Sequence, residues 1–422
     1  MYSRRYSRFL CLPLVALALA SFASRAGPTL SLIEAQRIAV GDAPQIDAQA
    51  AALRAAQQAS IGAGEQSDPK LIAGIENVPT DGADRFNLTR ESMTMRKIGI
   101  MQDFTRSEKL QLRGDRATAE VQKEAAILAV SKLNLRRDVA LAWIDRFYAE
   151  RQLDLLKELS RESELQVATA QAMLAGGKGQ AADTFAARLV VAQIADRTTD
   201  AERNIARAQA NLARWIGAAA RQPLEPAPAF DQLAHSQHEL TGNLEQHPHL
   251  AVYAPLQAMA TSEMKLADAA KRPDWSLEVA FAQRGPSYSN MLSIGVRIDL
   301  PIFQSRRQDP AVASKLALVE QVRAQAEDAK RTHAAEIETM LADWNAARAR
   351  LQRYDAELLP LAHERTAVTL ASYRGGKGDL TPVLEARKGE IETRMNHLMA
   401  QSELARAWAQ LNFLLPDKKD PS

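Results

Sequence analysis

Two short turns hold the residues with the clearest chemical potential, because each places a lysine among glycines. They read Gly176-Gly177-Lys178-Gly179 and Gly375-Gly376-Lys377-Gly378. Nucleotide-binding loops also combine glycines with a lysine, but serine or threonine follows that lysine and the preceding spacing differs. Glycine at a helix end reverses the chain, since it takes positive φ without steric penalty. Chain reversal alone explains the turns, and docking of a partner protein at them is the functional alternative.

Histidines raise the question of a metal site between the two turns. His235 and His238 are three residues apart, and His247 and His249 flank Pro248. No carboxylate or cysteine is arranged in the sequence to complete a coordination sphere. We therefore favour a solvated linker over a specific metal site.

The remaining reactive side chains indicate no catalytic chemistry. Met93, Met95 and Met101 are soft ligands of the kind that bind monovalent copper or silver, although packing in a loop or sheet is the simpler interpretation. The single cysteine, Cys11, lies in an N-terminal apolar run, so an exported chain would have no thiol. The sequence shows no nucleophile–base pair, paired catalytic carboxylates or cofactor fingerprint. We predict a protein that is not an enzyme and needs no cofactor.

The N-terminus has the pattern of a secretory signal peptide. Arg4, Arg5 and Arg8 precede a 12-residue apolar run, and small residues then allow cleavage after Ala23 or Ala26. An N-terminal anchor helix is the alternative, but the run is too short to span a bilayer. Lysine plus arginine (53) and aspartate plus glutamate (51) nearly balance, so no broad basic surface for nucleic acid is expected.

The chain repeats itself. The second glycine–lysine turn follows the first by 199 positions, and the same offset relates two Ala-Arg pairs, at 187–188 and 386–387. It also relates the alanine-rich segments 206–212 and 405–411. Further upstream the repeat persists with slightly different offsets. A chain built from two copies of one unit is not a single globular domain.

Each copy contains a short helical region, a strand pair and a long helical hairpin. The short helical regions are expected at about 31–66, interrupted near Pro44, and at about 240–271. The predicted divisions are a signal peptide 1–26, a first repeat 27–222 with strands 70–78 and 93–104 and hairpin 105–217, a linker 223–239, a second repeat 240–415 with strands 275–283 and 291–303 and hairpin 307–415, and a tail 416–422. Residues 105–175 contain no proline, so about 65 residues of helix would extend about 100 Å. Pro360 is expected to kink the corresponding arm of the second repeat.

The strands alternate between apolar and polar residues. Large apolar side chains such as Trp275 and Phe281 share one face, while Glu278, Arg297 and Asp299 share the other, which we predict to line a barrel lumen. About nine residues per strand is the length of membrane barrel strands, although a half-buried soluble hairpin has the same pattern. Four strands cannot close a barrel in lipid, so several chains must contribute. Three chains would give twelve strands; two or four are not excluded by this count.

The whole order of elements resembles the TolC-type outer membrane factors. The segment Ser372–Ala386 is similar to the family's hairpin-tip pattern, an aromatic–basic pair, a glycine and an aliphatic stretch ending in an acid and alanine. The segments 74–79 and 93–104 most resemble the CzcC/CusC-like members that serve heavy-metal efflux. The resemblance implies a mainly α-helical homotrimer. Its helices would form a tunnel across the periplasm, capped by a 12-stranded β-barrel in the lipid of the outer membrane.

The same resemblance assigns roles near the turns. The eight turn residues would dock on a periplasmic adaptor above an inner-membrane pump of the resistance-nodulation-division (RND) type. Acidic side chains would form rings around a closed aperture, and an aromatic–basic pair would latch it. These aperture residues are Asp183, Tyr373, Arg374, Asp379 and Glu385. The cargo would be metal cations; drugs or other small molecules, or a soluble periplasmic coiled-coil adaptor or scaffold in place of a channel, are the alternatives.

Overall fold

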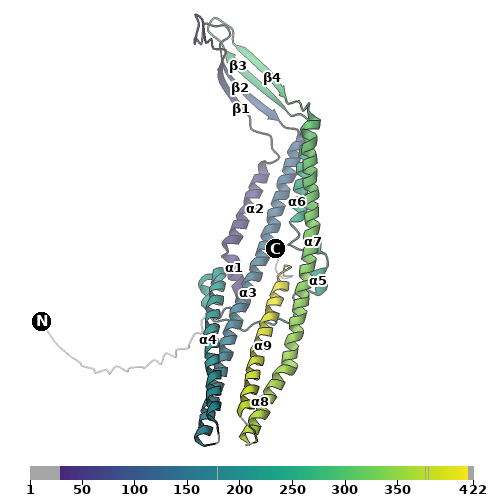
Figure 1. The fold of residues 1–422 in the computed structure, drawn as a ribbon. Helices are drawn as coiled ribbons and strands as arrows, with labels where there is room; N and C mark the ends of the chain where they lie inside the picture. The colour runs from purple at the N-terminus through teal and green to yellow at the C-terminus, as the bar shows by residue number, and fades with distance from the viewer. Residues whose placement is uncertain (1–28, 178, 376, 379, 417–422) are drawn as a thin grey trace, which may run out of the picture.

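The computed structural model describes residues 29–416 except 178, 376 and 379, and it shows a long, narrow molecule. Four strands form a sheet at one end, and two helical turns lie at the opposite end (Figure 1). Long helices run side by side between these ends. Among the described residues, no helix is both long and apolar enough to cross a membrane. The predicted signal peptide 1–26 and all but the first residue of the predicted tail 416–422 lie outside the described residues.

Both repeats contain short helices, a strand pair and a helical hairpin, in that order. The first repeat comprises α1 (Leu32–Gly41), α2 (Pro44–Gly62), β1 (Lys70–Glu76), β2 (Met95–Phe104), α3 (Ser107–Ala175) and α4 (Ala181–Ile216). The second comprises α5 (Gln237–Thr241), α6 (Tyr253–Ala269), β3 (Trp275–Gln283), β4 (Met291–Ile298), α7 (Gln308–Arg353), α8 (Leu359–Arg374) and α9 (Leu380–Asn412). The predicted fold class, mainly α with a duplicated strand pair and long hairpin, is confirmed.

Short helices of the first repeat begin where the sequence supplies caps. The side chain of Ser31 accepts a hydrogen bond of 3.1 Å from the backbone N–H of Glu34 and so caps α1. The next helix, α2, begins at Pro44, which tolerates the first helical turn because no N–H is needed there. The predicted interruption near Pro44 is therefore confirmed.

The corresponding helix of the second repeat differs from the prediction. A helix over about 240–271 was expected, but α6 begins only at Tyr253. Asn243 adopts a left-handed backbone conformation with φ 44°, and Pro248 has no N–H for a helical hydrogen bond. These two residues divide the region and turn the chain before α6.

The four strands form one antiparallel sheet in the order β1-β2-β3-β4, so the two repeats meet through β2 and β3. One row of paired residues runs from Leu71 through Ile100 and Val279 to Ile294. The outer edges of β1 and β4 have no strand partner in the described part of the chain. β4 ends at Ile298 instead of the predicted 303, close to Pro301, which cannot donate to a strand ladder.

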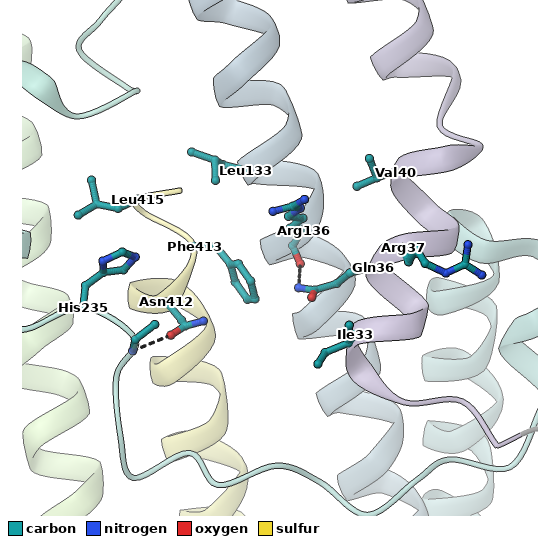
Figure 2. Close-up of a pocket in the computed structure, with 11 residues that line it drawn as sticks. Ile33, Gln36, Arg37, Val40, Leu133, Arg136, His235, Asn412, Phe413 and Leu415 are labelled. Carbon is teal, nitrogen blue, oxygen red and sulfur yellow. Dashed lines mark hydrogen bonds between the residues drawn. The ribbon is translucent and has the colours of Figure 1, made fainter. Parts of the chain in front are cut away.

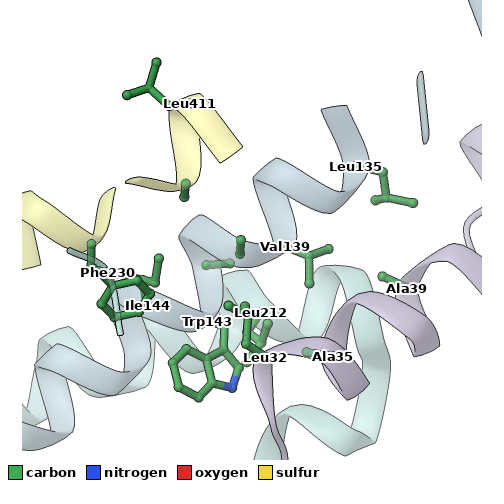
Figure 3. Close-up of a cluster of buried hydrophobic side chains, with 14 of the residues drawn as sticks. Leu32, Ala35, Ala39, Leu135, Val139, Trp143, Ile144, Leu212, Phe230 and Leu411 are labelled. Carbon is green, nitrogen blue, oxygen red and sulfur yellow. The ribbon is translucent and has the colours of Figure 1, made fainter. Parts of the chain in front are cut away.

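The largest core lies midway along the molecule, around Trp143 where α1, α3, α4 and α9 meet (Figure 3). Trp143 is fully buried, and its indole Nε1 donates a hydrogen bond of 3.1 Å to the Leu30 carbonyl oxygen. Trp344 on α7 repeats this arrangement, with a bond of 3.2 Å to the carbonyl of Phe230. Each repeat thus fixes the segment that precedes it with one tryptophan of its long helix.

The two hairpins differ in continuity. α3 runs unbroken for 69 residues, which corresponds to about 100 Å. The equivalent arm of the second repeat is divided by a π-helical turn, Tyr354–Leu358, between α7 and α8. Pro360 lies in the first turn of α8 and has no N–H for the carbonyl one turn earlier. The predicted interruption is present, and the widened turn immediately before the proline absorbs it.

Candidate functional site

The turn between α3 and α4 is closed by backbone hydrogen bonds, and its geometry favours glycine at two positions. The N–H groups of Gly176 and Gly177 donate to the carbonyls of Ala172 (3.0 Å) and Leu174 (3.1 Å). Gly177 has φ +68°, a conformation that side chains disfavour. A Cβ at Gly179 would lie 3.0 Å from the Leu174 nitrogen, so a larger residue there would need the neighbouring backbone to shift.

The second turn closes in a similar way. Gly375 N–H donates to the carbonyl of Ala371 at 2.9 Å, and Lys377 N–H donates to that of Ser372 at 3.0 Å. Lys377 and Gly378 are exposed, as docking residues must be. Three residues of the predicted sites lie outside the described residues, namely Lys178, Gly376 and Asp379.

The two turns lie together and form one end surface. Ala170 of α3 is buried against Leu380 and Val383 of α9, and Tyr373 packs against this cluster. Burial raises the pKa of the Tyr373 hydroxyl, and the negative charge of Asp183 on α4 raises it further. The ends of α3, α8 and α9 therefore pack together, and the two turns lie at the same end of the molecule (Figure 1).

The predicted aperture residues fall into two groups. Asp183 and Tyr373 are close enough to interact, and the Asp183 carboxylate also accepts a hydrogen bond of 3.3 Å from the N–H of Gln180 and so caps α4. Arg374 and Glu385 are exposed, and Arg374 makes no ion pair with the described residues of its own chain. An aperture needs several copies of the chain, so the ring and latch roles stay predictions.

A series of ion pairs between α3 and α9, which the sequence interpretation missed, holds the two hairpins together. Arg394 pairs with Glu158 at 2.8 Å, and Arg406 binds both carboxylate oxygens of Asp145 at 2.7 and 2.9 Å. Closer to the tip, Arg387 pairs with Glu162. The seven-residue spacing of Arg387 and Arg394 is a signal of one helix face that the sequence did contain.

The ion pair of Arg387 extends to a buried carboxylate. Glu390 is 6% exposed. Its carboxylate accepts hydrogen bonds from Arg387 Nη1 at 2.9 Å and from His363 Nδ1 at 3.2 Å. Burial alone would raise the pKa of Glu390, but hydrogen bonds from Thr366, Arg387 and His363 outweigh it and lower the pKa below its ordinary value. Glu390 is therefore a charged group that depends on its neighbours.

One face of the sheet presents a continuous apolar surface to the outside. Its large side chains are each exposed by two fifths or more, although they would be expected in a core. Phe104 and Trp275 stack with ring centroids 4.2 Å apart at one end of this face. Its exposed members are Leu71, Ile75, Ile98, Ile100, Trp275, Val279, Phe281, Leu292, Ile294, Val296 and Ile298. The predicted alternation thus places these residues together on one side.

The opposite face is polar, and its charges neutralise one another. Lys97 lies between Glu278 (2.8 Å) and Glu76 (3.2 Å), and Arg297 is 3.9 Å from Glu278. Of the predicted lumen residues, Glu278 and Arg297 are therefore brought together, whereas Asp299 follows the end of β4. Lys97 was missed because the alternation in the first repeat is weaker.

The polar face is also crowded. Ala280 and Ala282 are almost fully buried, whereas Val279, which points to the apolar face, is 40% exposed. Gly99 stands opposite Ala280 in the neighbouring strand, with no room for a Cβ. The polar face is therefore tightly packed where β2 meets β3.

The prediction of a solvated histidine linker is wrong for three of the four histidines. His235 and His247 are only 5% and 2% exposed and His249 is half-buried, whereas His238 is exposed as expected. For His247 and His249 the physical reason is a distant partner, His333 on α7, against which both pack, whereas His235 lies beside Asn412 and Phe413 at the end of α9. Within the described residues, no cluster of three or more metal-ligating side chains is arranged to hold a metal ion.

A cavity of about 370 Å³ lies between α1, α3 and the end of α9, far from the turns and the sheet (Figure 2). Gln36 donates a hydrogen bond of 2.9 Å to the Arg136 carbonyl, and the Asn412 side chain accepts one of 3.0 Å from the N–H of Ala234. These polar groups join neighbouring segments to one another. We assign the cavity a structural role at the junction of the repeats.

Comparison with protein families finds one match. Residues 242–416 match the family model described as "Outer membrane efflux protein", which corresponds to most of the second repeat. Comparison with curated proteins finds no similar sequence.

Over about nine tenths of its length the chain shares its fold with solved membrane proteins. The outer membrane protein VceC from Vibrio cholerae has a TM-score of 0.77 and 19% identity, over 91% of this chain and 95% of that one. The CmeC outer membrane channel from Campylobacter jejuni has a TM-score of 0.75 and 12% identity, over 92% of this chain and 87% of that one. CusC has a TM-score of 0.70 and 16% identity, over 91% of this chain and 92% of that one. These matches include an efflux protein family and an outer membrane channel and no enzyme, in agreement with the prediction that the chain is not an enzyme.

Proposed function

We propose that the chain is one subunit of an outer membrane channel, the passive exit duct of a tripartite efflux system. The observation that carries this proposal is a sheet at one end of a helix about 100 Å long. This sheet has an exposed apolar face and two edges without a strand partner in the described part of the chain. The family match over 242–416 and the fold shared with outer membrane channels support it.

Closure of the channel follows from the free edges. In lipid every backbone N–H and C=O needs a partner, so the outer edges of β1 and β4 must pair with other strands. Pairing β4 of one copy with β1 of the next leaves no edge once the ring closes. Three copies would provide twelve strands, a number within the range of outer-membrane barrels.

The two ends of the molecule then have different roles. The apolar face of the sheet would contact lipid, and the polar face with Lys97, Glu278 and Arg297 would line the lumen. The paired turns at the far end would dock on a periplasmic adaptor above an inner-membrane RND pump. Asp183 and Glu385 would repeat around the axis as acidic rings that attract cations.

We propose heavy-metal cations as the cargo. The resemblance of segments 74–79 and 93–104 to CzcC/CusC-like members and the similarity to CusC support this choice. VceC and CmeC give higher TM-scores than CusC, so the fold does not favour the metal subgroup. Drugs and dyes are therefore the second candidate cargo.

The experiment that tests the proposal combines localisation of the protein with the tolerance of the cells to metal salts. Outer-membrane fractions should contain a detergent-requiring oligomer whose electrophoretic mobility changes on heating, and deletion of the gene should lower tolerance to a set of metal salts. Recovery of a lone, lipid-free monomer from osmotic-shock fluid would overturn the channel. Lost tolerance to drugs with unchanged tolerance to metals would overturn only the cargo.

Docking at the turns gives a sharper prediction. Gly177→Trp should lower tolerance and crosslinking to the adaptor at unchanged oligomer level, because the bulky ring blocks close approach of a partner. The positive φ of Gly177 costs a tryptophan about 1–2 kcal/mol, too little to unfold the long hairpin. Gly177→Asn is the matched control, since asparagine adopts this conformation more readily and adds a small side chain. Equal crosslinking in wild type and Gly177→Trp would contradict the docking role.

A further inference from the structure

Three histidines meet in the middle of the molecule, away from the proposed lumen and docking surfaces. His247 and His249 come from the segment between α5 and α6, and His333 comes from α7. Nδ1 of His247 lies 3.1 Å from Nε2 of His333, and the rings of His249 and His333 stack with centroids 5.4 Å apart. His247 is 2% exposed and His333 is 6% exposed, so water has little access to the cluster.

The hydrogen-bond partners of the three rings limit how many protons their nitrogens can carry. The two nitrogens at 3.1 Å share one proton, because one ring must donate and the other must offer a lone pair. Nε2 of His249 donates to the side-chain oxygen of Asn134 at 3.3 Å, and its Nδ1 has no partner among the described residues. A proton added to Nδ1 of His249 would create a buried N–H without an acceptor among the described residues. A further proton on the pair would lie on the outer nitrogen of His247 or His333, where hydrogen bonds to the backbone of Gly242 and Glu239 and to Glu336 offset burial only in part.

The charges around the cluster do not compensate for three positive rings. One carboxylate approaches it, Glu336 of α7, whose Oε2 is 3.7 Å from Nδ1 of His333 and whose side chain is 55% exposed. Arg137 of α3 acts on His249 with a positive charge. Among the residues that the structure describes, Glu336 supplies a solvated carboxylate and Arg137 a guanidinium, a balance that favours neutral imidazoles.

The directions of the pKa shifts agree with this geometry. Burial lowers the pKa of His247, His249 and His333 below the ordinary 6.5, and the charge of His333 lowers those of the other two further. When the segment opens, the rings regain ordinary values. The closed form is therefore fully stable above pH 6.5 and loses stability as the pH falls from 6.5 toward the lowered values.

A neighbouring ion pair does not titrate in this range. Glu245, in the same segment, pairs with Lys330 of α7 at 2.8 Å. The hydrogen bond from Lys330 lowers the pKa of Glu245 below 4.5, and the same bond raises the pKa of Lys330 above 10.5. This pair keeps its charges while the histidines take up protons.

We propose that the three histidines form an acid-sensitive clamp, which holds the segment 243–252 of the second repeat against α7 and α3 at neutral pH and releases it at mildly acidic pH. The segment leads directly into α6 and so connects the clamp to the packing of the second repeat. The clamp is a property of the single chain and does not depend on the cargo or on the channel.

Hydrogen–deuterium exchange of the full-length protein in detergent tests the clamp. Peptides covering 243–252 are compared at about pH 7.5 and about pH 5.5, with labelling times corrected for intrinsic exchange. Protection of this segment should fall about tenfold for each histidine kept neutral one pH unit below 6.5. Unchanged protection in the wild type would overturn the clamp.

Variants decide which groups are responsible. His333→Gln and His247→Gln each remove one titrating ring and keep a polar side chain, so both should reduce the loss of protection at least several-fold. His238→Gln is the matched control, because His238 lies in the same region but is exposed. A full wild-type response in both cluster variants would overturn the clamp, and if one variant does not accumulate, the other decides by itself.

Discussion

Replacing Arg387 with methionine is expected to lower the free energy of unfolding by about 3 kcal/mol, the lower end of the range for removing one partner of a buried ion pair. Glu390 would stay buried at 6% exposure with its principal cation gone, and Glu162 on the other hairpin would lose its partner. The lower end applies because Thr366 and His363 still donate to Glu390. The measurement is thermal unfolding of the purified protein by circular dichroism at one scan rate.

Two variants make this prediction specific to the buried charge. Arg350→Met removes a pair with Glu403 in which both side chains are nearly half exposed, so it should cost only about 0–1 kcal/mol. The double change Arg387→Met with Glu390→Leu removes both charges and should recover much of the lost stability. If Arg387→Met destabilises no more than Arg350→Met, the buried pair does not join the hairpins as described.

Gly99→Val is expected to abolish most of the assembled oligomer. A Cβ at this position would lie 2.5 Å from the Cβ of Ala280 and 2.7 Å from the carbonyl oxygen of Val279. Overpacking typically costs about 1–3 kcal/mol, and here the obstacle includes backbone, so β2 and β3 would have to separate. The first repeat pairs with the second in the sheet through these two strands. The measurement is the amount of heat-modifiable oligomer in outer-membrane fractions.

The matched controls lie on the same face of the sheet. A Cβ at Gly74 of β1 or Gly295 of β4 would meet nothing within 4 Å. Valine favours strands, so Gly74→Val and Gly295→Val should assemble at close to wild-type levels. Assembly of Gly99→Val at the level of these controls would show that the strands are not packed as tightly as described.

The elements with a strong internal period could be predicted from the sequence. The two faces of β3 were evident because a two-residue alternation assigns every side chain to one side or the other. The helix over 107–175 was evident because no proline interrupts it. The predicted end of β4 at 303 was wrong since strand pairing stops where the partner strand begins, at Trp275 opposite Ile298.

Contacts between distant segments were less accessible. The burial of His247 depends on His333, which lies 86 positions later on another helix, and no local pattern reveals that proximity. The pairing of Arg387 with Glu162 likewise joins residues 225 positions apart. The duplicated tryptophans were a missed signal: Trp143 and Trp344 follow similar Leu-Ala sequences and make equivalent hydrogen bonds.

The π-helical turn at Tyr354–Leu358 gives the two halves of the molecule unequal stiffness. A continuous rod such as α3 resists bending along its length, whereas an arm with a widened turn and a proline yields there first. In a closed ring of three copies, stiff helical arms and more flexible ones would alternate around the wall of the tunnel. A sideways force on the periplasmic end would then bend every second arm at the level of its π-helical turn and leave the other arms straight.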